Sequence, residues 1–154
     1  MSEGTDCEAC GLASGSGRAG CEATFNEVVA REFADFRYGR LHRTTVDAYA
    51  LQHPDRYCAS GKSFAAHLTG LCCAVEYGNQ PSVHARVRRW LDGPRAIQTP
   101  PLPGWRGSVT IGSVAAMTEP TDHLRAVEAW ARDVWDACGP IQPLAREWIR
   151  AALT

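Results

Sequence analysis

The chain has 154 residues, of which 45% are hydrophobic and 21% are charged. These proportions are typical of a soluble globular protein and exclude an intrinsically disordered tail. Its 16 basic and 17 acidic residues give a net charge of −1, so no general basic surplus attracts nucleic acid or anionic lipid. We find no apolar stretch of the length that a transmembrane helix needs.

The N-terminal sequence is polar and acidic, without the basic segment and apolar run of a signal peptide, so we expect a cytoplasmic protein. In a reducing compartment a CxxC pair serves metal or redox chemistry more often than a structural disulfide, and the odd total of seven cysteines fits a disulfide framework poorly. The length favours a single domain over residues 1–154, with a cysteine-rich leader at 1–22 and a body at 23–154.

Apolar residues recur with helical spacing along most of the body, which predicts an all-α fold. In the first helix the apolar stripe includes Phe33 and Phe36, and we expect this stripe to face the core. The third helix is apolar on nearly every side, as a central helix would be. The predicted compact bundle of five or six helices covers about 23–36, 44–53, 60–78, 81–91, 119–138 and 143–154.

Two stretches of the body interrupt the helical pattern. Residues 92–107 hold four prolines and three glycines, which predicts an extended loop. The following segment, GSVTIGSV at 107–114, alternates β-branched residues, and we expect a short strand or extended arm there. The densest basic cluster, HARVRR at 84–89, is interpreted as the solvent-facing side of a helix and not as a nucleic-acid patch.

The leader contains Cys7, Cys10 and Cys21 in a glycine- and serine-rich segment. A CxxC pair followed by Gly11 suits the tight turn of a zinc knuckle, which brings both sulfurs to one side of the chain. Cys21 starts the first helix, where the helix dipole favours a thiolate. We therefore expect these cysteines to bind one metal ion, with zinc as the default for a sulfur-rich site. The alternatives are free thiols or a redox CxxC, although the strand–helix context of thioredoxin-like motifs is missing.

Three thiolates leave a tetrahedral zinc one ligand short. We expect His42 to supply the fourth ligand, because it precedes the second helix, where the chain returns after the first. His53 and His67 are the alternatives. Cys72 and Cys73 lie in an apolar helical run, where cysteine usually acts as a small hydrophobe.

A second group of polar side chains lies in the middle of the chain, within HRTTVDAYALQHP at 42–54 and in the next helix. Asp47, His53 and His67 are candidates for a catalytic pocket, because facing helices of a bundle often carry metal or acid–base sites. The competing interpretation is a buried polar network in which Asp47 and His67 bond to each other and fix the helix packing.

Five segments together resemble a bacterial domain-of-unknown-function family, the one numbered five-nine-four-six. They are CxxCG near the start, GC, HRTTVDAYALQHP, KSFAAHLTGLCCAVEYG and AWARDVW. The similarity covers most of the chain, and the block from His42 through His67 is its specific part. The resemblance implies a compact helical domain and no activity, so the function has to be argued from the residues.

Two classes of function follow from these motifs. The first is a zinc-stapled binding or regulatory module, with a closed metal site and no chemistry. The second is a hydrolase-like, metal-dependent enzyme that uses Asp47, His53 and His67. We favour the module, because a cysteine-rich site favours a closed structural shell and the sequence shows no activated nucleophile and no phosphate loop. Its partner would be a protein or a small molecule, and we expect neither nucleic acid nor membrane.

Overall fold

The computed structural model describes residues 5–102, 104 and 107–154. Over these residues the chain forms no strand, and the predicted all-α fold is confirmed. Three short helices, α2, α4 and α7, add to the six that the periodicity predicts. The helices are α1 Gly17–Ala34, α2 Phe36–Gly39, α3 His42–Gln52, α4 Pro54–Tyr57, α5 Gly61–Glu76, α6 Pro81–Leu91, α7 Ile111–Ala115, α8 Pro120–Ala137 and α9 Gln142–Leu153, with a 3-10 turn, η1, at Gly139–Ile141.

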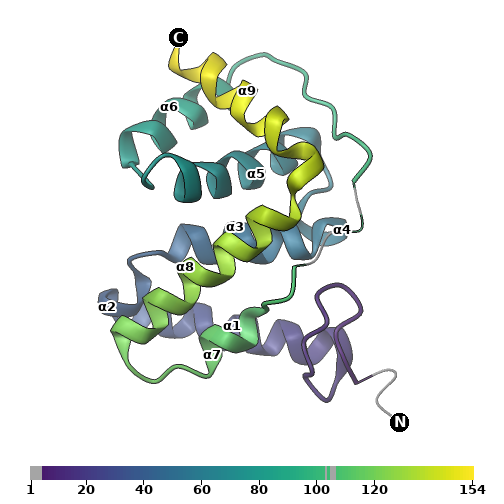
Figure 1. Ribbon diagram of the computed structural model, residues 1–154, viewed down its shortest axis with the longest axis vertical. Coiled ribbons are helices and arrows are strands. Elements are labelled where there is room, and N and C mark those ends of the chain that lie inside the picture. Colours follow the sequence, from purple (N-terminus) through teal and green to yellow (C-terminus); the bar gives the residue numbers. More distant parts are fainter. Residues whose placement is uncertain (1–4, 103, 105–106) are drawn as a thin grey trace.

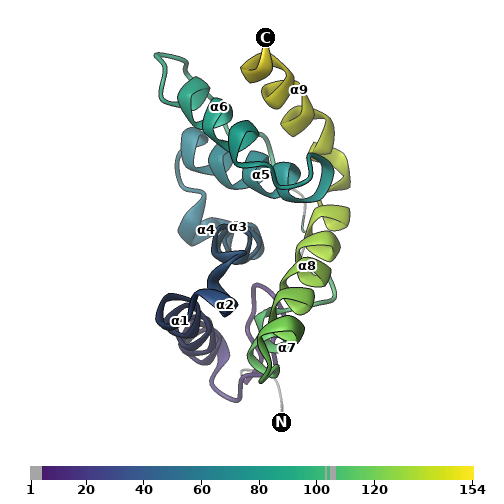
Figure 2. The same ribbon diagram turned by 90° about the vertical axis from the view of Figure 1, so that its left-hand side faces the viewer.

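The helices are stacked along the long axis of the molecule (Figure 1). α5, α6 and α9 form the upper part, α3 and α8 cross the middle, and α1, α2 and α7 form the lower part. Figure 2 shows α8 running along one edge, from α7 up to the base of α9. Among the described helices, none combines the length and the apolar character that crossing a membrane requires.

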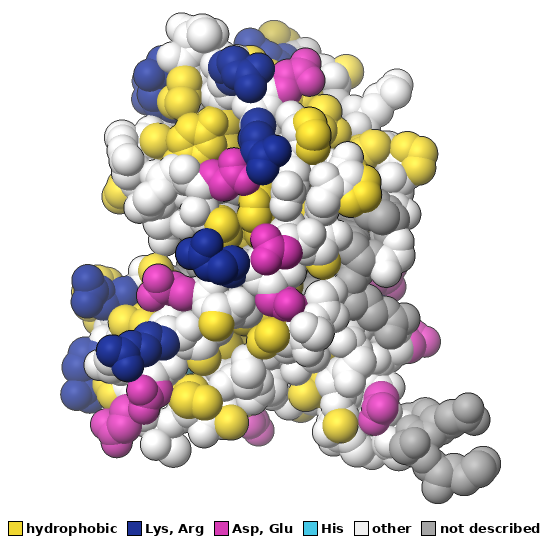
Figure 3. All heavy atoms as spheres, in the orientation of Figure 1, with side chains coloured by type: hydrophobic (Ala, Val, Ile, Leu, Met, Phe, Trp, Pro, Cys, Tyr) yellow, Lys and Arg dark blue, Asp and Glu magenta, His cyan; other side chains and the backbone are white. Residues whose placement is uncertain are grey.

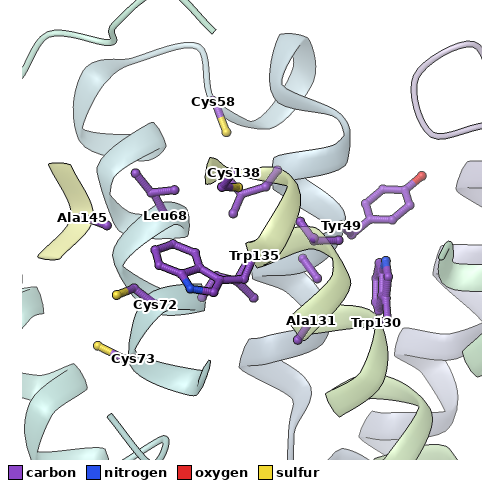
Figure 4. Packing of buried hydrophobic residues seen from close by; sticks show 14 of the residues in the cluster. Tyr49, Cys58, Leu68, Cys72, Cys73, Trp130, Ala131, Trp135, Cys138 and Ala145 are labelled. Atoms are coloured by element: carbon purple, nitrogen blue, oxygen red, sulfur yellow. The ribbon is translucent and has the colours of Figure 1, made fainter. Parts of the chain in front are cut away.

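The core lies where α3, α5 and α8 meet. α8 buries Val127, Trp130 and Val134, which are three and four positions apart and therefore share one face of the helix. α5 contributes side chains such as Leu68, in agreement with its prediction as a central helix. Figure 4 shows Leu68 of α5 and Trp135 of α8 in this part of the core.

The loop after α6 is extended, as predicted, over its described residues, while Pro103 and residues 105–106 lie outside them. It is held against α5, since the Lys62 ammonium donates to the Gly93 carbonyl oxygen at 2.7 Å. The backbone of Ile97 comes so close to Gly61 that a Cβ at this position would collide with the Ile97 carbonyl oxygen. Gly61 is thus needed for the close approach of the loop.

Two local predictions are wrong. The second half of the expected strand or arm is the short helix α7, because the Thr110 hydroxyl caps it by accepting from the Gly112 N–H at 3.2 Å. The aromatic end of the first stripe does not face the core, since Phe33 and Phe36 are 74% and 78% exposed. α1 ends at Ala34, and α2 continues in a new direction.

Candidate metal centre

Three cysteines and one histidine meet where the N-terminal segment folds against α1 and the end of α3. The sulfurs of Cys7, Cys10 and Cys21 and a ring nitrogen of His53 all lie within 4.8 Å of one another. The Cys10 and Cys21 sulfurs are 3.7 Å apart. His53 Nε2 lies 3.6 Å from the Cys7 sulfur and 3.5 Å from the Cys21 sulfur. All four side chains are buried, at most 5% exposed, and we call them the Cys3His cluster.

A tight turn presents the first two cysteines. The Gly11 N–H donates to the Cys7 carbonyl oxygen, and the Cys7 N–H donates to the Leu12 carbonyl oxygen, both at 2.8 Å. Gly11 has a φ of +85°, a conformation that favours glycine. A bridge between Asp6 and Ala13 closes the base of the loop. The backbone therefore forms the knuckle-like turn that the CxxCG motif predicts.

The third cysteine, Cys21, lies in the second turn of α1, beyond the first turn in which the helix dipole favours a thiolate, so this part of the sequence prediction is wrong. α1 begins at Gly17, earlier than the predicted end of the leader at residue 22. The Ser14 hydroxyl fixes the approach to the helix, because it lies 2.7 Å from the Gly17 carbonyl oxygen and 3.1 Å from that of Thr5. These contacts place Cys21 opposite the knuckle.

His53 is the residue at which α3 ends. It precedes Pro54, and a residue before proline is disfavoured in the helical conformation, so the chain leaves the α3 axis at this point. The His53 Nδ1 lies 2.8 Å from the Tyr49 carbonyl oxygen. Because a carbonyl oxygen only accepts, Nδ1 carries the proton and donates, which leaves the Nε2 lone pair facing the sulfurs.

A stack of three rings fixes the plane of this imidazole. The rings of Phe25 and Tyr49 have centroids 3.9 Å apart and are inclined by 7°, and the rings of Tyr49 and His53 have centroids 4.0 Å apart. Phe25 lies one turn after Cys21 in α1, so the stack also aligns α1 with α3. The Tyr49 hydroxyl lies 3.3 Å from the Cys21 sulfur. Burial raises the pKa of Tyr49, which keeps this hydroxyl protonated and able to donate to a thiolate.

The pKa values of Cys10 and Cys21 are shifted in opposite directions. The hydrogen bond from the Cys21 thiol holds the pKa of Cys10 well below its usual value, whereas the same contact and burial raise the pKa of Cys21. Arg18 lies close by and pairs with Asp55 at 2.8 Å; this hydrogen bond, and more weakly the charge of Cys7, raise the pKa of Arg18. The contact between the two sulfurs thus favours one thiolate, on Cys10.

The structure does not bring His42 to the cysteines. Its Nδ1 lies 2.9 Å from the Glu32 carboxylate, in a separate buried network. Glu32 also accepts from the Thr45 hydroxyl at 2.7 Å and lies 2.9 Å from Nε2 of His123. The carboxylate holds His42 away from the Cys3His cluster, and His53, one of the two alternatives, lies beside the cysteines instead.

Asp47 and His67 form the pair that the sequence suggested, with 2.9 Å between Oδ1 and Nδ1. His53 belongs to the Cys3His cluster and not to this pair. Asp47 is only 4% exposed, and burial raises its pKa. Its second oxygen has no hydrogen-bond partner within the described chain, and a Cβ at Gly70 would collide with it. The pair joins α3 to α5 within the packed interior.

The other four cysteines are core residues. They lie among apolar side chains between α3, α5 and α8 (Figure 4). Burial raises their pKa values to about 11 or 12, so that they remain neutral thiols; they are Cys58, Cys72, Cys73 and Cys138. The prediction that Cys72 and Cys73 act as small hydrophobes is confirmed.

Residues 5–139 match a protein family whose description is Family of unknown function (DUF5946). No curated protein and no solved structure matches the chain. The matched region includes the whole Cys3His cluster as well as the networks around Glu32 and Asp47. The resemblance seen in the sequence is confirmed, and it leaves the role of the protein to be inferred from the site.

Proposed function

The chain belongs to the family of unknown function DUF5946, and we propose its role from the geometry, because the family assigns no activity. We propose that the protein is a zinc-stapled binding or regulatory module. In this proposal Cys7, Cys10, Cys21 and His53 hold one structural zinc ion. The metal joins the N-terminal segment, the start of α1 and the end of α3.

The spacing of the ligand atoms is the observation that carries the proposal. In a tetrahedral site with typical zinc bond lengths, two sulfurs lie about 3.8 Å apart, and a sulfur and a nitrogen lie about 3.5 Å apart. The Cys10 and Cys21 sulfurs are 3.7 Å apart. His53 Nε2 lies 3.6 Å and 3.5 Å from the sulfurs of Cys7 and Cys21. These atoms are at the separations that a zinc ion requires.

The donor set favours zinc and a structural role. Thiolate and imidazole are the ligands of structural zinc sites, and four of them complete a tetrahedron. Catalytic zinc sites more often have three protein ligands and a water molecule. The four side chains are at most 5% exposed, so the shell is closed to solvent as well as complete.

When bound, zinc supplies a cross-link between distant parts of the chain. Cys7 and His53 are 46 positions apart in the sequence. The ion pair of Arg18 with Asp55 joins the same two regions, but exposed ion pairs contribute only about 0–1 kcal/mol. A structural zinc site contributes far more, because the metal binds the folded arrangement of ligands and not the unfolded chain. The lower part of the molecule should therefore depend on the metal.

The alternative, a hydrolase-like metal-dependent enzyme, has less support. It needs Asp47, His53 and His67 to share one pocket, whereas His53 faces the cysteines and Asp47 is paired with His67. It also needs an open coordination position, and four buried protein donors leave none. A closed module accounts for both features.

Elemental analysis of reduced protein purified without added metal tests the proposal. We expect about one zinc per chain, and we expect Cys10→Ser to lose it. Cys58→Ser is the matched control, because Cys58 is also buried but lies outside the Cys3His cluster. This control should retain zinc.

Folded, reduced wild-type protein without zinc would contradict the proposal. So would a disulfide between Cys10 and Cys21 in protein isolated under reducing conditions. Substitution with Co²⁺ separates the module from the enzyme, because the visible spectrum reports the coordination number. A four-coordinate, thiolate-rich spectrum supports the closed site, and a five- or six-coordinate spectrum supports the enzyme.

A further inference from the structure

A basic, concave surface lies at the opposite end of α3 from the Cys3His cluster. It is a cavity of about 400 Å³ between the α2–α3 connection and α6, and its lining includes Arg40, Arg43 and Arg88. Figure 2 faces the side on which α5 and α6 lie above α2 and α3. We call this surface the arginine groove.

A second cavity, of about 310 Å³, continues the groove along α5. It shares Arg43 and Arg88 with the first cavity and adds Lys62 and Ser63 to the lining. The two shared arginines come from helices far apart in the sequence, and they stand where the two cavities join. Their position makes them the centre of the groove.

The face of α6 that lines the groove is defined by helical spacing. Pro81, His84 and Arg88 lie three and four positions apart and therefore share one side of the helix. Arg86 and Arg89, from the same basic segment, line a different cavity. In the segment at 84–89 the arginines are exposed, in agreement with the interpretation as the solvent-facing side of a helix, while His84 and Val87 are buried.

Positive charge predominates in the groove. Among the acidic groups, Asp92 lines the second cavity and the Asp47 Oδ2 lies 3.9 Å from Arg43 Nε, while Glu128 lines a neighbouring cavity that shares Leu41 with the groove. Within the described residues, neither Arg40 nor Arg88 has an ion-pair partner. The groove therefore has more positive than negative side chains, with three arginines and a lysine beside two carboxylates.

The His84 imidazole lies in the wall of the groove. Burial, and then the positive charge of Arg43, lower the pKa of His84 to about 4. The ring is therefore neutral near pH 7, and its Nε2 lies 2.7 Å from the Asn79 side-chain oxygen, to which it donates. His84 therefore carries no charge in the groove, and the arginines are the side chains that can bind an anionic ligand.

On the face drawn in Figure 3, several basic side chains lie next to acidic ones. Several arginines outside the groove form short ion pairs of 2.6–2.8 Å, namely Arg18 with Asp55, Arg37 with Asp35, Arg56 with Glu22 and Arg146 with Glu76. The arginines of the groove lack such pairs although they surround a concave surface. Guanidinium groups left in this state are suited to an external oxyanion, which they bind through paired N–H donors.

We propose that the arginine groove binds a small organic phosphate, with the phosphoryl group between Arg43 and Arg88. A phosphoryl group is close to dianionic at neutral pH and offers three acceptor oxygens, which matches several cations better than one carboxylate does. The combined cavities are larger than a phosphate ion, so an organic part lies against apolar lining such as Leu41 and Ala85. The groove shares no residue with the Cys3His cluster, and this proposal stands apart from the zinc.

Isothermal titration of the protein as purified, dialysed free of unbound metal, tests the proposal at low salt, with pyrophosphate and glucose 6-phosphate as probes. We expect saturable binding at one site. Arg88→Gln should weaken it about tenfold or more, as expected for the loss of a charge-assisted hydrogen bond. Arg89→Gln is the matched control, because it removes the same charge from the next position of α6, outside the groove. It should change the affinity less than about twofold.

Arg40→Gln is a second variant, because Arg40 lines the groove on the side opposite α6. It replaces Arg88→Gln in the test if circular dichroism shows that Arg88→Gln is unfolded, and it should also weaken binding. Absence of saturable binding, or equal weakening by Arg88→Gln and Arg89→Gln, would overturn the proposal. Succinate binding as tightly as pyrophosphate would assign the groove to carboxylates instead. A single-stranded oligonucleotide that binds tightly and is not displaced by pyrophosphate would assign it to nucleic acid. The zinc content should be the same in all of these variants.

Discussion

The imidazole of His53 is held by the backbone of Tyr49, whose carbonyl oxygen accepts from Nδ1 at 2.8 Å. The rings of the same two residues stack with centroids 4.0 Å apart. Histidine ligands of metals usually have an outer partner of this kind, which fixes the tautomer and the direction of the second nitrogen. The position of Nε2 among the sulfurs is therefore set by α3 itself and does not depend on a metal.

The first prediction contrasts two histidines. His53→Ala removes a ligand and should lower zinc affinity by at least about a hundredfold, since even outer partners of ligands are worth 10–100-fold. His42→Ala should leave zinc affinity unchanged, because His42 contacts Glu32 and not the cysteines. The measurement is zinc content after dialysis against a graded series of chelators. Loss of zinc in both variants to the same extent would show that the fourth ligand is not His53.

The second prediction concerns the buried carboxylate of Glu32. Its oxygens face donors from His42, Thr45 and His123, at 2.9, 2.7 and 2.9 Å. In Glu32→Gln one acceptor oxygen becomes an NH2 group that faces donors, so the free energy of unfolding should fall by about 3 kcal/mol. Glu27→Gln, at an exposed site of α1, is the control and should change it by less than about 0.5 kcal/mol. Denaturation with urea measures both, and an equal effect would contradict the role of Glu32.

The third prediction concerns Gly70, in the middle of α5. Replacing a helix glycine by alanine normally stabilises a protein by about 1 kcal/mol. Gly70→Ala should instead destabilise it by about 2 kcal/mol, because the new Cβ would collide with the Asp47 carboxylate. Gly139→Ala, with open space around its Cα, should be close to neutral. In an Asp47→Ala background the penalty at Gly70 should disappear, and a penalty that persists there would show that another contact causes it.

The fourth prediction concerns pH and His84. Its folded pKa, about 4, lies below the ordinary value of 6.5, so folding favours the neutral ring. This preference contributes fully to the free energy of unfolding above pH 6.5. The contribution, about 2–3 kcal/mol, is lost as the pH falls towards 4. His84→Gln cannot become charged, so its free energy of unfolding should fall less between pH 7 and pH 4 than that of the wild type. Equal losses in the two proteins would mean that His84 is protonated without penalty.

The long helices could be predicted because their apolar spacing extends over several turns. The short helices α2, α4 and α7 could not, since four or five residues are too few to show a period. The error at Phe33 and Phe36 has the same origin, because the stripe was continued through Asp35, where α1 stops. The Asp35 carboxylate accepts from the Arg37 N–H at 3.0 Å, and an aspartate just before a new helix is a cap signal that the sequence does contain.

The meeting of the three cysteines could be predicted from the CxxCG turn and one further cysteine, because the turn is local. The fourth ligand depends on how α1 and α3 pack, which spacing does not reveal. The position of His42, where the chain returns after the first helix, favours it as the fourth ligand, but its ring contacts the Glu32 carboxylate instead. Pro54 was the available signal near His53, because a proline directly after a residue disfavours the helical conformation there and ends the helix.

The order of the ligands along the chain has a consequence for biosynthesis. His53 is the last of the four residues of the Cys3His cluster, so all four are present before the ribosome has made any residue of α5, α6, α8 or α9. Chains emerge from the N-terminal side, and partly made chains expose apolar surface that favours aggregation. A zinc ion taken up at this stage would hold α1 against α3 and present a fixed surface on which the later helices assemble. Zinc supply during translation would then govern how much of the newly made protein reaches the native state.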